Sequence, residues 1–161
     1  MPTPARESRN ATDAEALLVE ALFNATRTFR HRLRPALEGT GLTSPMFWTL
    51  HQLVLDGPLT VGHLADACVV TPANVSATAE QLEQAGLVAR SSAPHDRRVV
   101  VLSPTARGRS AHRAVWTRLG RLLGASLSEL RAADLDAATR VLAHLAGTPE
   151  AVAVVLEGST A

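Results

Sequence analysis

The chain of 161 residues has little sulfur, few aromatic rings and no lysine. Its single cysteine, Cys68, excludes an internal disulfide framework. No run of about 18 apolar residues occurs, so no membrane-spanning helix is expected. The first residues, Met1–Arg6, lack the apolar centre of a secretory signal, and we expect a cytoplasmic protein. Aromatic residues make up 3% and hydrophobic residues 46%, so Leu, Val and Ala must build the core of one globular domain.

The charge of the chain is unevenly distributed along the sequence. All sixteen basic residues are arginine, and the formal net charge is only +1. The segment from Arg90 to Arg121 holds eight arginines and one acid, Asp96, which gives it a charge of about +7 and leaves about −6 for the rest. A concentrated basic segment of this kind is typical of an edge that binds nucleic acid.

A short helix is predicted to begin after Thr60, whose hydroxyl can cap its first turn. Leu64 and Cys68 are four residues apart and therefore share one face of that helix. The helix is expected to end at Val69–Val70. On the apolar side of the helix, Cys68 is expected to be a buried structural thiol, although a sensing role stays open.

A second helix is predicted to follow directly, with Thr71 as its N-cap and Pro72 at its first position. Three apolar residues recur at helical spacing and should face the core, namely Val75, Ala79 and Leu82. The other faces carry small or hydrogen-bonding side chains, namely Ala73, Asn74, Ser76, Ala77 and Gln81. Such a surface suits close approach to base edges and phosphates, although it also occurs on an ordinary solvated helix.

A β-hairpin with a charged tip is predicted after this helix. Gly86 stands where a helix C-cap needs a left-handed residue, and Leu87–Val88 begins a strand. Val99–Leu102 is β-branched and apolar, as expected of a second strand. The turn between them carries Asp96-Arg97-Arg98, whose arginines can reach phosphates or a narrow minor groove, or belong to a solvated turn. Two helices followed by a hairpin predict a winged helix-turn-helix.

The stretch Leu42–Gly108 resembles the MarR family of bacterial transcription regulators. The family's Asp-x-Arg wing signature falls on Asp96 and Arg98. The resemblance implies a homodimer that binds palindromic double-stranded operator DNA and is often released by a small molecule. The residues that carry it are Leu42-Thr43, Leu64-Ala65, Thr71 to Ser76, Leu82-Glu83, Gly86-Leu87-Val88, Arg90, Asp96-Arg97-Arg98 and Leu102-Ser103.

DNA contacts are therefore expected from the second helix of the pair and from the wing. The expected DNA-binding residues are Thr71, Pro72, Ala73, Asn74, Ser76, Arg90, Asp96, Arg97 and Arg98.

The predicted fold is mainly α with a small β-hairpin wing and with dimerisation helices at both ends. We expect residues 1–11 to form a flexible tail and residues 12–161 to form a single domain. Within that domain, residues 44–102 should be the DNA-binding lobe. The helices in 12–38 and 104–161 carry apolar stripes with no obvious intrachain partner, which predicts that two copies of the chain pair.

Four Ser/Thr-based signals predict where helices begin. A capping box at Thr12–Glu15 predicts the start of the first long helix, which should end at Gly39–Gly41. Ser44–Pro45, Ser103–Pro104 and Thr148–Pro149 each place a capping hydroxyl before a proline. The helix that begins near Pro104 is expected to continue to about Leu127.

A small-molecule site is predicted where the long helices should converge. A cleft that combines aromatic rings with one or two arginines suits a small planar aromatic acid, although both tryptophans could be ordinary core residues. The candidate residues are Trp48, His51, Arg113 and Trp116, with Phe23, Arg27 and Arg30 on the first helix nearby.

Other chemistry finds little support in the sequence. The six histidines are scattered without the spacing of a zinc helix motif, so no metal site and no cofactor are expected. We also expect no enzyme activity, because no nucleophile elbow, phosphate loop or paired-carboxylate pattern occurs. Two alternatives stay open, namely a metal- or thiol-switched regulator and a winged-helix module that binds protein instead of DNA.

Overall fold

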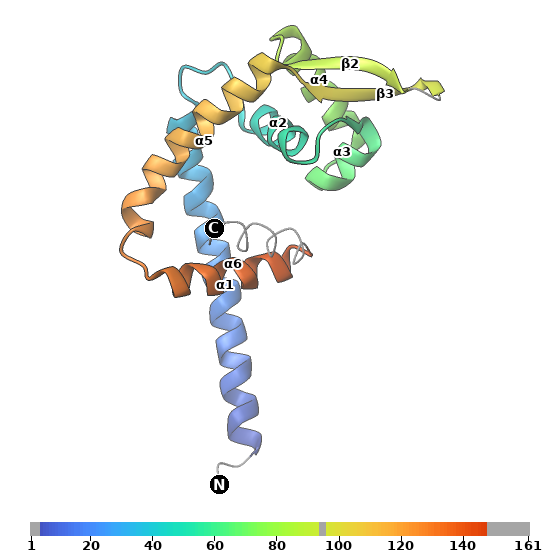
Figure 1. The fold of residues 1–161 in the computed structure, drawn as a ribbon. Coiled ribbons are helices and arrows are strands. Elements are labelled where there is room, and N and C mark those ends of the chain that lie inside the picture. Colours follow the sequence, from blue (N-terminus) through green and yellow to red (C-terminus); the bar gives the residue numbers. More distant parts are fainter. Residues whose placement is uncertain (1–3, 94–95, 148–161) are drawn as a thin grey trace. The chain divides into compact units, whose positions relative to one another are not determined.

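The computed structural model describes residues 4–93 and 96–147, which are mainly helical with one small antiparallel sheet (Figure 1). The predicted fold class is therefore confirmed. In chain order the elements are α1 (Pro4–Leu37), α2 (Ser44–Asp56), β1 (Leu59–Thr60), α3 (Val61–Cys68), α4 (Pro72–Gln84), β2 (Val88–Ala93), β3 (Asp96–Pro104), α5 (Ala106–Leu127) and α6 (Ala132–Leu145).

Two compact units divide the chain, Met1–Leu119 and Gly120–Ala161, and their boundary falls inside α5. The first unit contains every element from α1 to β3 and the N-terminal part of α5. The prediction of one domain over residues 12–161 stays a prediction.

Helix α1 begins earlier than the sequence predicted. Its first residue is Pro4, so the start expected at Thr12 is wrong, as is a tail that reaches residue 11. Proline suits the first position of a helix, and the following residues to Ala11 include no glycine or proline that would interrupt it. The predicted end is confirmed, because Gly39 and Gly41 both adopt left-handed backbone angles with φ of 73°. The helix expected after Thr148–Pro149 lies outside the described residues.

Helices α2, α3 and α4 pack against one another around an aliphatic core. Leu50, Leu53 and Leu64 are completely buried there, and so is the predicted inner face of α4, Val75, Ala79 and Leu82. The predicted N-caps are confirmed at Thr60, whose hydroxyl accepts the His63 N–H, and at Thr71, which accepts the Asn74 N–H. At α2 the cap is Thr43 rather than Ser44, because the Thr43 hydroxyl accepts the Met46 N–H.

The wing is part of a three-stranded sheet with β3 in the centre, in the order β1-β3-β2. The run Val99–Leu102 is the middle of β3, as predicted. The sequence did not predict that Leu59 of β1 pairs with Leu102. Strand β1 has only two residues, which is too short to show the alternation of a strand in sequence. Since β1 runs directly into α3, it fastens the base of the wing to the helix-turn-helix.

Helix α5 begins against the first residues of the wing. Ser103–Pro104 ends β3 instead of capping α5, and the cap is Thr105, whose hydroxyl accepts the Gly108 N–H at 3.0 Å. That hydroxyl also lies 2.9 Å from the carbonyl oxygen of Gly86 and 3.1 Å from that of Leu87, to which it can donate. Gly108 is buried, and a Cβ added there would lie 2.0 Å from the Leu87 carbonyl oxygen.

Large apolar side chains stay exposed on several of the helices, most of all on α1 and α6. On α1 they include Leu17, Leu18, Val19 and Phe23, and on α6 they are Val141, Leu142 and Leu145. Among the α1 residues whose burial the structure describes, the buried ones are Leu33 and Ala36, near the C-terminal end of the helix. Among the described helices, none is both long enough and apolar enough to cross a membrane.

Candidate functional site

The outer face of α4 carries the five residues predicted to contact DNA from this helix. Thr71, Pro72, Ala73, Asn74 and Ser76 are all exposed. The Ser76 hydroxyl donates to the carbonyl oxygen of Pro72 at 2.9 Å, so its proton is already used within the helix. In the described structure the Asn74 side chain has no hydrogen-bond partner. Its amide therefore offers both a donor and an acceptor to an approaching base edge.

The turn before α4 contains a left-handed valine. Val69 has φ 54° and ψ 47°, and its N–H points to the carbonyl oxygens of Ala65 and Asp66 at the end of α3. Its side chain is 90% exposed, so no burial offsets the strain of this conformation. The residue ends α3 and allows Thr71 to start α4 two residues later.

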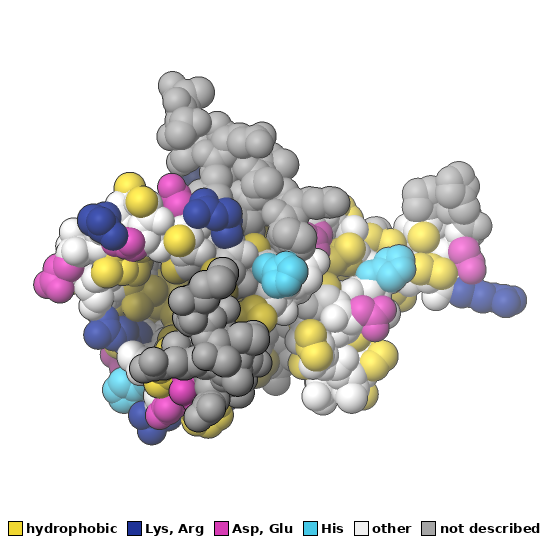
Figure 2. Space-filling view, turned by 90° about the horizontal axis from the view of Figure 1, so that it is seen from below, with side chains coloured by type: hydrophobic (Ala, Val, Ile, Leu, Met, Phe, Trp, Pro, Cys, Tyr) yellow, Lys and Arg dark blue, Asp and Glu magenta, His cyan; other side chains and the backbone are white. Residues whose placement is uncertain are grey.

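At the wing tip, Asp96 orders the backbone. Its carboxylate accepts the backbone N–H of Arg98 at 2.9 Å. The Arg98 side chain is exposed and forms no ion pair with any described residue. Figure 2 shows a basic side chain that projects from the end of the molecule where the wing lies in Figure 1. Arg97 lies in β3, and its side chain is outside the described part of the structure.

Arg90 has a protein partner, although it was predicted as a DNA contact. Its Nε lies 2.8 Å from Oε2 of Glu83, and both side chains are partly exposed. The pair joins β2 of the wing to the last turn of α4. An exposed pair of this kind contributes at most about 1 kcal/mol, but it connects the two elements that are expected to enter DNA grooves.

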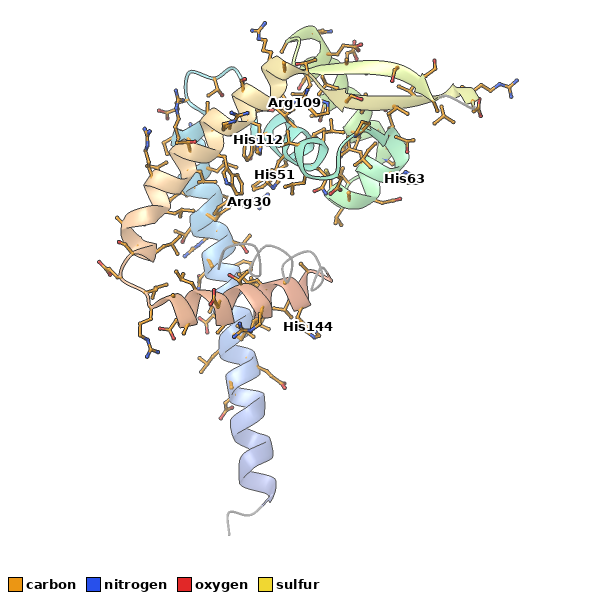
Figure 3. The ribbon with its side chains drawn as sticks, in the orientation of Figure 1. Arg30, His51, His63, Arg109, His112 and His144 are labelled. Carbon is orange, nitrogen blue, oxygen red and sulfur yellow. The ribbon has the colours of Figure 1, made fainter. Side chains whose placement is uncertain are left out.

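Four of the chain's five Phe and Trp residues gather in one aromatic cluster, together with two histidines (Figure 3). Helix α2 provides Phe47, Trp48 and His51, α5 provides His112 and Trp116, and α1 provides Phe29. The tightest ring contact joins His51 to Trp116, with centroids 4.8 Å apart and planes at 16°. Phe47 is completely buried at the base of the cluster, whereas Trp116 is 47% exposed.

Three of the four predicted ligand residues therefore meet in this cluster, namely Trp48, His51 and Trp116. Arg113 does not join them. It lies exposed on α5, with no hydrogen bond or ion pair to the rest of the described structure.

Two histidines from distant parts of the chain form a hydrogen bond within the cluster. Nδ1 of His51 and Nε2 of His112 are 2.8 Å apart. Burial lowers the pKa of both imidazoles, and the proximity of His112 lowers the pKa of His51 further, whereas the charge of Asp56 acts to raise it. Both rings are therefore biased toward the neutral form.

The sequence did not predict a role for His112. One signal was available, because Phe47 and His51 are four residues apart and so are His112 and Trp116, which gives each helix an aromatic–histidine face. That the two faces meet across 61 residues is a tertiary fact with no local signature.

A second surface of interest lies along α1. An open hollow of about 470 Å³ is lined by Val19, Leu22, Phe23, Thr26, Arg27 and Arg30. It includes all three residues that the sequence placed near a ligand on the first helix, and it combines one aromatic ring with two cations.

The alternative switches would depend on the Cys68 thiol or on metal-ligating side chains. Burial raises the pKa of the Cys68 thiol, and so does the charge of Asp56, which disfavours the reactive thiolate. No group of three metal-ligating side chains occurs within residues 4–93 and 96–147.

A family model and a curated protein are both similar in sequence to this chain, and both point to the same family. A family model described as MarR family matches residues 40–99. The chain is 30% identical over 134 residues to the HTH-type transcriptional repressor MdtR of Bacillus subtilis (strain 168), a match that covers 83% of this chain and 84% of that protein.

Solved structures show the same similarity. The YusO protein of Bacillus subtilis is 28% identical with a TM-score of 0.61, and the match covers 86% of this chain and 96% of that one. NadR, solved in complex with 4-hydroxyphenylacetate, is 25% identical with a TM-score of 0.69, covering 78% of this chain and 89% of that one.

Proposed function

This chain belongs to the MarR family of transcriptional regulators, and we propose that it is a homodimeric repressor of palindromic operator DNA, released by a small aromatic acid. Regulators of this family bind DNA and dimerise, and some bind small-molecule ligands. Repression is proposed because the relative MdtR is named a repressor.

The observation that carries the DNA-binding proposal is the pairing of two exposed elements. The outer face of α4 presents small side chains and the unpartnered amide of Asn74, which suits the major groove. The wing presents Arg98 at a tip ordered by Asp96, which suits the phosphate backbone or the minor groove. The Glu83–Arg90 pair connects these elements, so they meet the duplex together.

Operator binding can be tested once genomic DNA enriched by the protein has supplied a site. Asn74→Ala should lose about 1–3 kcal/mol of preference for operator over random DNA, because a base contact specifies sequence. The double variant Arg97→Ala, Arg98→Ala should weaken binding to both operator and random DNA. It should also reduce the slope of log affinity against log salt concentration by roughly 1–2. Unchanged discrimination together with an unchanged slope would favour a protein-binding module instead.

The dimer proposal is based on the exposed apolar side chains of α1. Leu18 and Phe23 are 43% and 72% exposed, on a helix whose N-terminal part has no buried residue among those described. Burial of this surface by a second copy would remove it from water. In sedimentation analysis, Phe23→Asp should shift the protein from dimer toward monomer. A wild-type protein that sediments as a monomer would contradict the proposal.

The ligand proposal combines the aromatic cluster with a nearby cation. Because the rings of His51 and Trp116 already stack, a ligand ring must lie against the exposed part of Trp116 or displace it. Arg113, three residues before Trp116 on the same helix, would then pair with the ligand carboxylate. The complex of NadR with 4-hydroxyphenylacetate supports a ligand of this chemical class.

Calorimetry with 4-hydroxyphenylacetate and benzoate tests this site. Trp48→Ala and Arg113→Ala should each weaken binding, and Arg30→Ala serves as the comparison because it alters the hollow on α1 instead. A ligand that weakens DNA binding tenfold needs about 1.4 kcal/mol of differential affinity, which one arginine–carboxylate contact can supply. Binding that survives both cluster variants and is lost in Arg30→Ala would move the site to the α1 hollow.

A further inference from the structure

The hydrogen bond between His51 and His112 connects two parts of the protein that differ in role. His51 lies on α2, which packs directly against the recognition helix α4. His112 lies on α5, which leads away from the wing (Figure 1). We propose that this histidine pair is a proton-operated joint, which holds α2 to α5 while it carries at most one added proton and opens when it takes up two. The effect on DNA affinity rests on the function proposed above.

The geometry leaves little room for the two rings to adjust. Their nitrogens are 2.8 Å apart, and the ring planes differ by 27°. Phe47 stacks on His112 with centroids 5.6 Å apart and planes at 10°, while Trp116 stacks on His51. His112 is only 9% exposed. Water therefore has limited access to replace a lost bond between the rings.

Proton counting shows why the second proton matters. In the neutral pair, one of the two facing nitrogens carries a hydrogen and donates it to the other, which accepts through its lone pair. A first added proton can settle on the outer nitrogen of the donor ring, so the bond survives as a charge-assisted one. A second proton can go only to the accepting nitrogen. The bond is then lost, and two N–H groups of two positive rings face each other at hydrogen-bond distance.

The surrounding charges favour this order of events. Asp56 on α2 raises the pKa of His51 and therefore supports the first proton. Burial opposes charge on both rings, and the charge of each ring opposes charge on the other. The other charged or titratable groups on these helices include Arg27, Arg30, His31, Arg32 and Arg34 of α1, His63, Asp66 and Cys68 of α3, Glu80 and Glu83 of α4, and Arg107, Arg109, Arg113, Arg118 and Arg121 of α5. In Figure 3 His63 lies on α3, apart from the labelled His51 and His112. Arg109 donates to the Pro104 carbonyl at 2.8 Å.

An opened joint would act on DNA binding through α2. That helix contacts both α3 and α4, so a change in how α2 rests on α5 changes how the helix-turn-helix is held. A doubly charged pair favours separation of α2 from α5, whereas DNA binding requires one fixed presentation of α4 and the wing. Each proton linked to this change alters DNA affinity by up to tenfold per pH unit.

The two tryptophans of the chain report directly on the pair. Both contact His51, with ring centroids 5.6 Å away for Trp48 and 4.8 Å away for Trp116. An imidazolium beside an indole quenches its fluorescence, so the emission of the wild-type protein should fall as pH is lowered from about 8 to about 5, with a midpoint below about 6.5. In an NMR titration of the same protein, the ring signals of His51 and His112 should change together in two steps.

Isosteric amides provide the matched variants. Asparagine places its amide where Nδ1 of His51 lies, and glutamine places its amide where Nε2 of His112 lies. The double variant His51→Asn, His112→Gln should therefore keep a hydrogen bond that does not titrate and should lose the acid quenching. The control variant is His63→Gln, which replaces an exposed histidine on α3. Its tryptophan fluorescence should change with pH as in the wild type. Quenching that persists in the double variant, or independent one-step NMR titrations of the two rings near pH 6.5, would overturn the proposal.

DNA affinity at about pH 7.5 and about pH 5.5 completes the test. Between these two pH values the DNA affinity of the wild type should fall by at least about tenfold more than the DNA affinity of the double variant. Equal acid sensitivity of the two proteins, alongside a titrating pair, would show that the pair does not act on DNA binding and would refute the joint. A protein that binds no DNA at pH 7.5 would refute the proposed function, while the spectroscopic titrations would still decide whether the pair opens.

Discussion

Replacing Gly108 with alanine should destabilise the protein, whereas the same change at most helical glycines stabilises it. It lies in the first turn of α5 and is buried against the start of the wing. An added Cβ would lie 2.0 Å from the carbonyl oxygen of Leu87, 3.0 Å from its carbonyl carbon and 3.3 Å from Cδ1 of Leu50. The Leu87 carbonyl cannot move away freely, because it also accepts the Thr105 N–H at 3.0 Å.

The expected magnitude follows from two opposing effects. Replacing a helical glycine by alanine ordinarily stabilises a protein by up to about 1 kcal/mol. At Gly108 the methyl group must displace a backbone carbonyl, and overpacking of this kind costs about 1–3 kcal/mol. Loss of a hydrogen bond at Leu87 adds about 1 kcal/mol more. The net result for Gly108→Ala should therefore be a destabilisation of roughly 1–3 kcal/mol.

Gly120 provides the matched control on the same helix. A Cβ added there meets no atom within 4 Å, so Gly120→Ala should stabilise by up to about 1 kcal/mol. Urea unfolding followed by circular dichroism would measure both variants against the wild type. Gly108→Ala should also bind operator DNA more weakly, because β2 begins at Val88 directly after the displaced carbonyl. Changes of the same sign and size in both variants would refute the close packing of α5 against the wing.

Three further changes have expected outcomes that unfolding measurements can check. Val69→Gly should raise the free energy of unfolding by roughly 1 kcal/mol, because glycine adopts the left-handed conformation without the strain of a β-branched side chain; a loss of stability would contradict this. Thr71→Ala should lower stability by about 1 kcal/mol through loss of the N-cap of α4, and Thr71→Ser should restore most of it. Stability should fall as pH drops below about 6.5, because the pKa values of His51 and His112 are lowered in the folded state and the unfolded chain therefore binds more protons there; a pH profile that does not change in the double variant His51→Asn, His112→Gln would contradict that assignment.

The sequence predicted well the features that depend on neighbouring residues. The caps at Thr60 and Thr71 are confirmed, as is the left-handed backbone at Gly86, with φ of 70°. Each depends on hydrogen bonds or sterics within about four residues, so each has a local signature. The buried face of α4 was predictable for the same reason, since helical spacing alone puts Val75 and Leu82 on one side.

Features built by distant residues were not predictable. The pairing of Leu59 with Leu102, the contact of Gly108 with Leu87 and the bond between His51 and His112 all depend on how elements pack in space. The early start of α1 shows a different limit, since the capping box at Thr12 was a valid local signal inside a helix that begins at Pro4.

The DNA-binding residues stay predictions of another kind. The structure shows that Asn74 and Arg98 are exposed and that Arg90 has Glu83 as a partner, but contact with a base or phosphate is a property of a complex. The candidate ligand residues stay predictions for the same reason, although three of them share one cluster.

The exposed N-terminal part of α1 has a consequence for gene dosage. The helix is 34 residues long, and its described burial is confined to residues near its C-terminal end. Helices without tertiary packing are marginal in water, so in the proposed dimer the ordering of this segment and the joining of two chains form one equilibrium. When most chains are unpaired, the amount of dimer rises with the square of the amount of chain. Halving the expression of the gene would then reduce the amount of the proposed dimer by up to about fourfold. The activity of a promoter under its control would therefore change by a larger factor than the amount of the protein does.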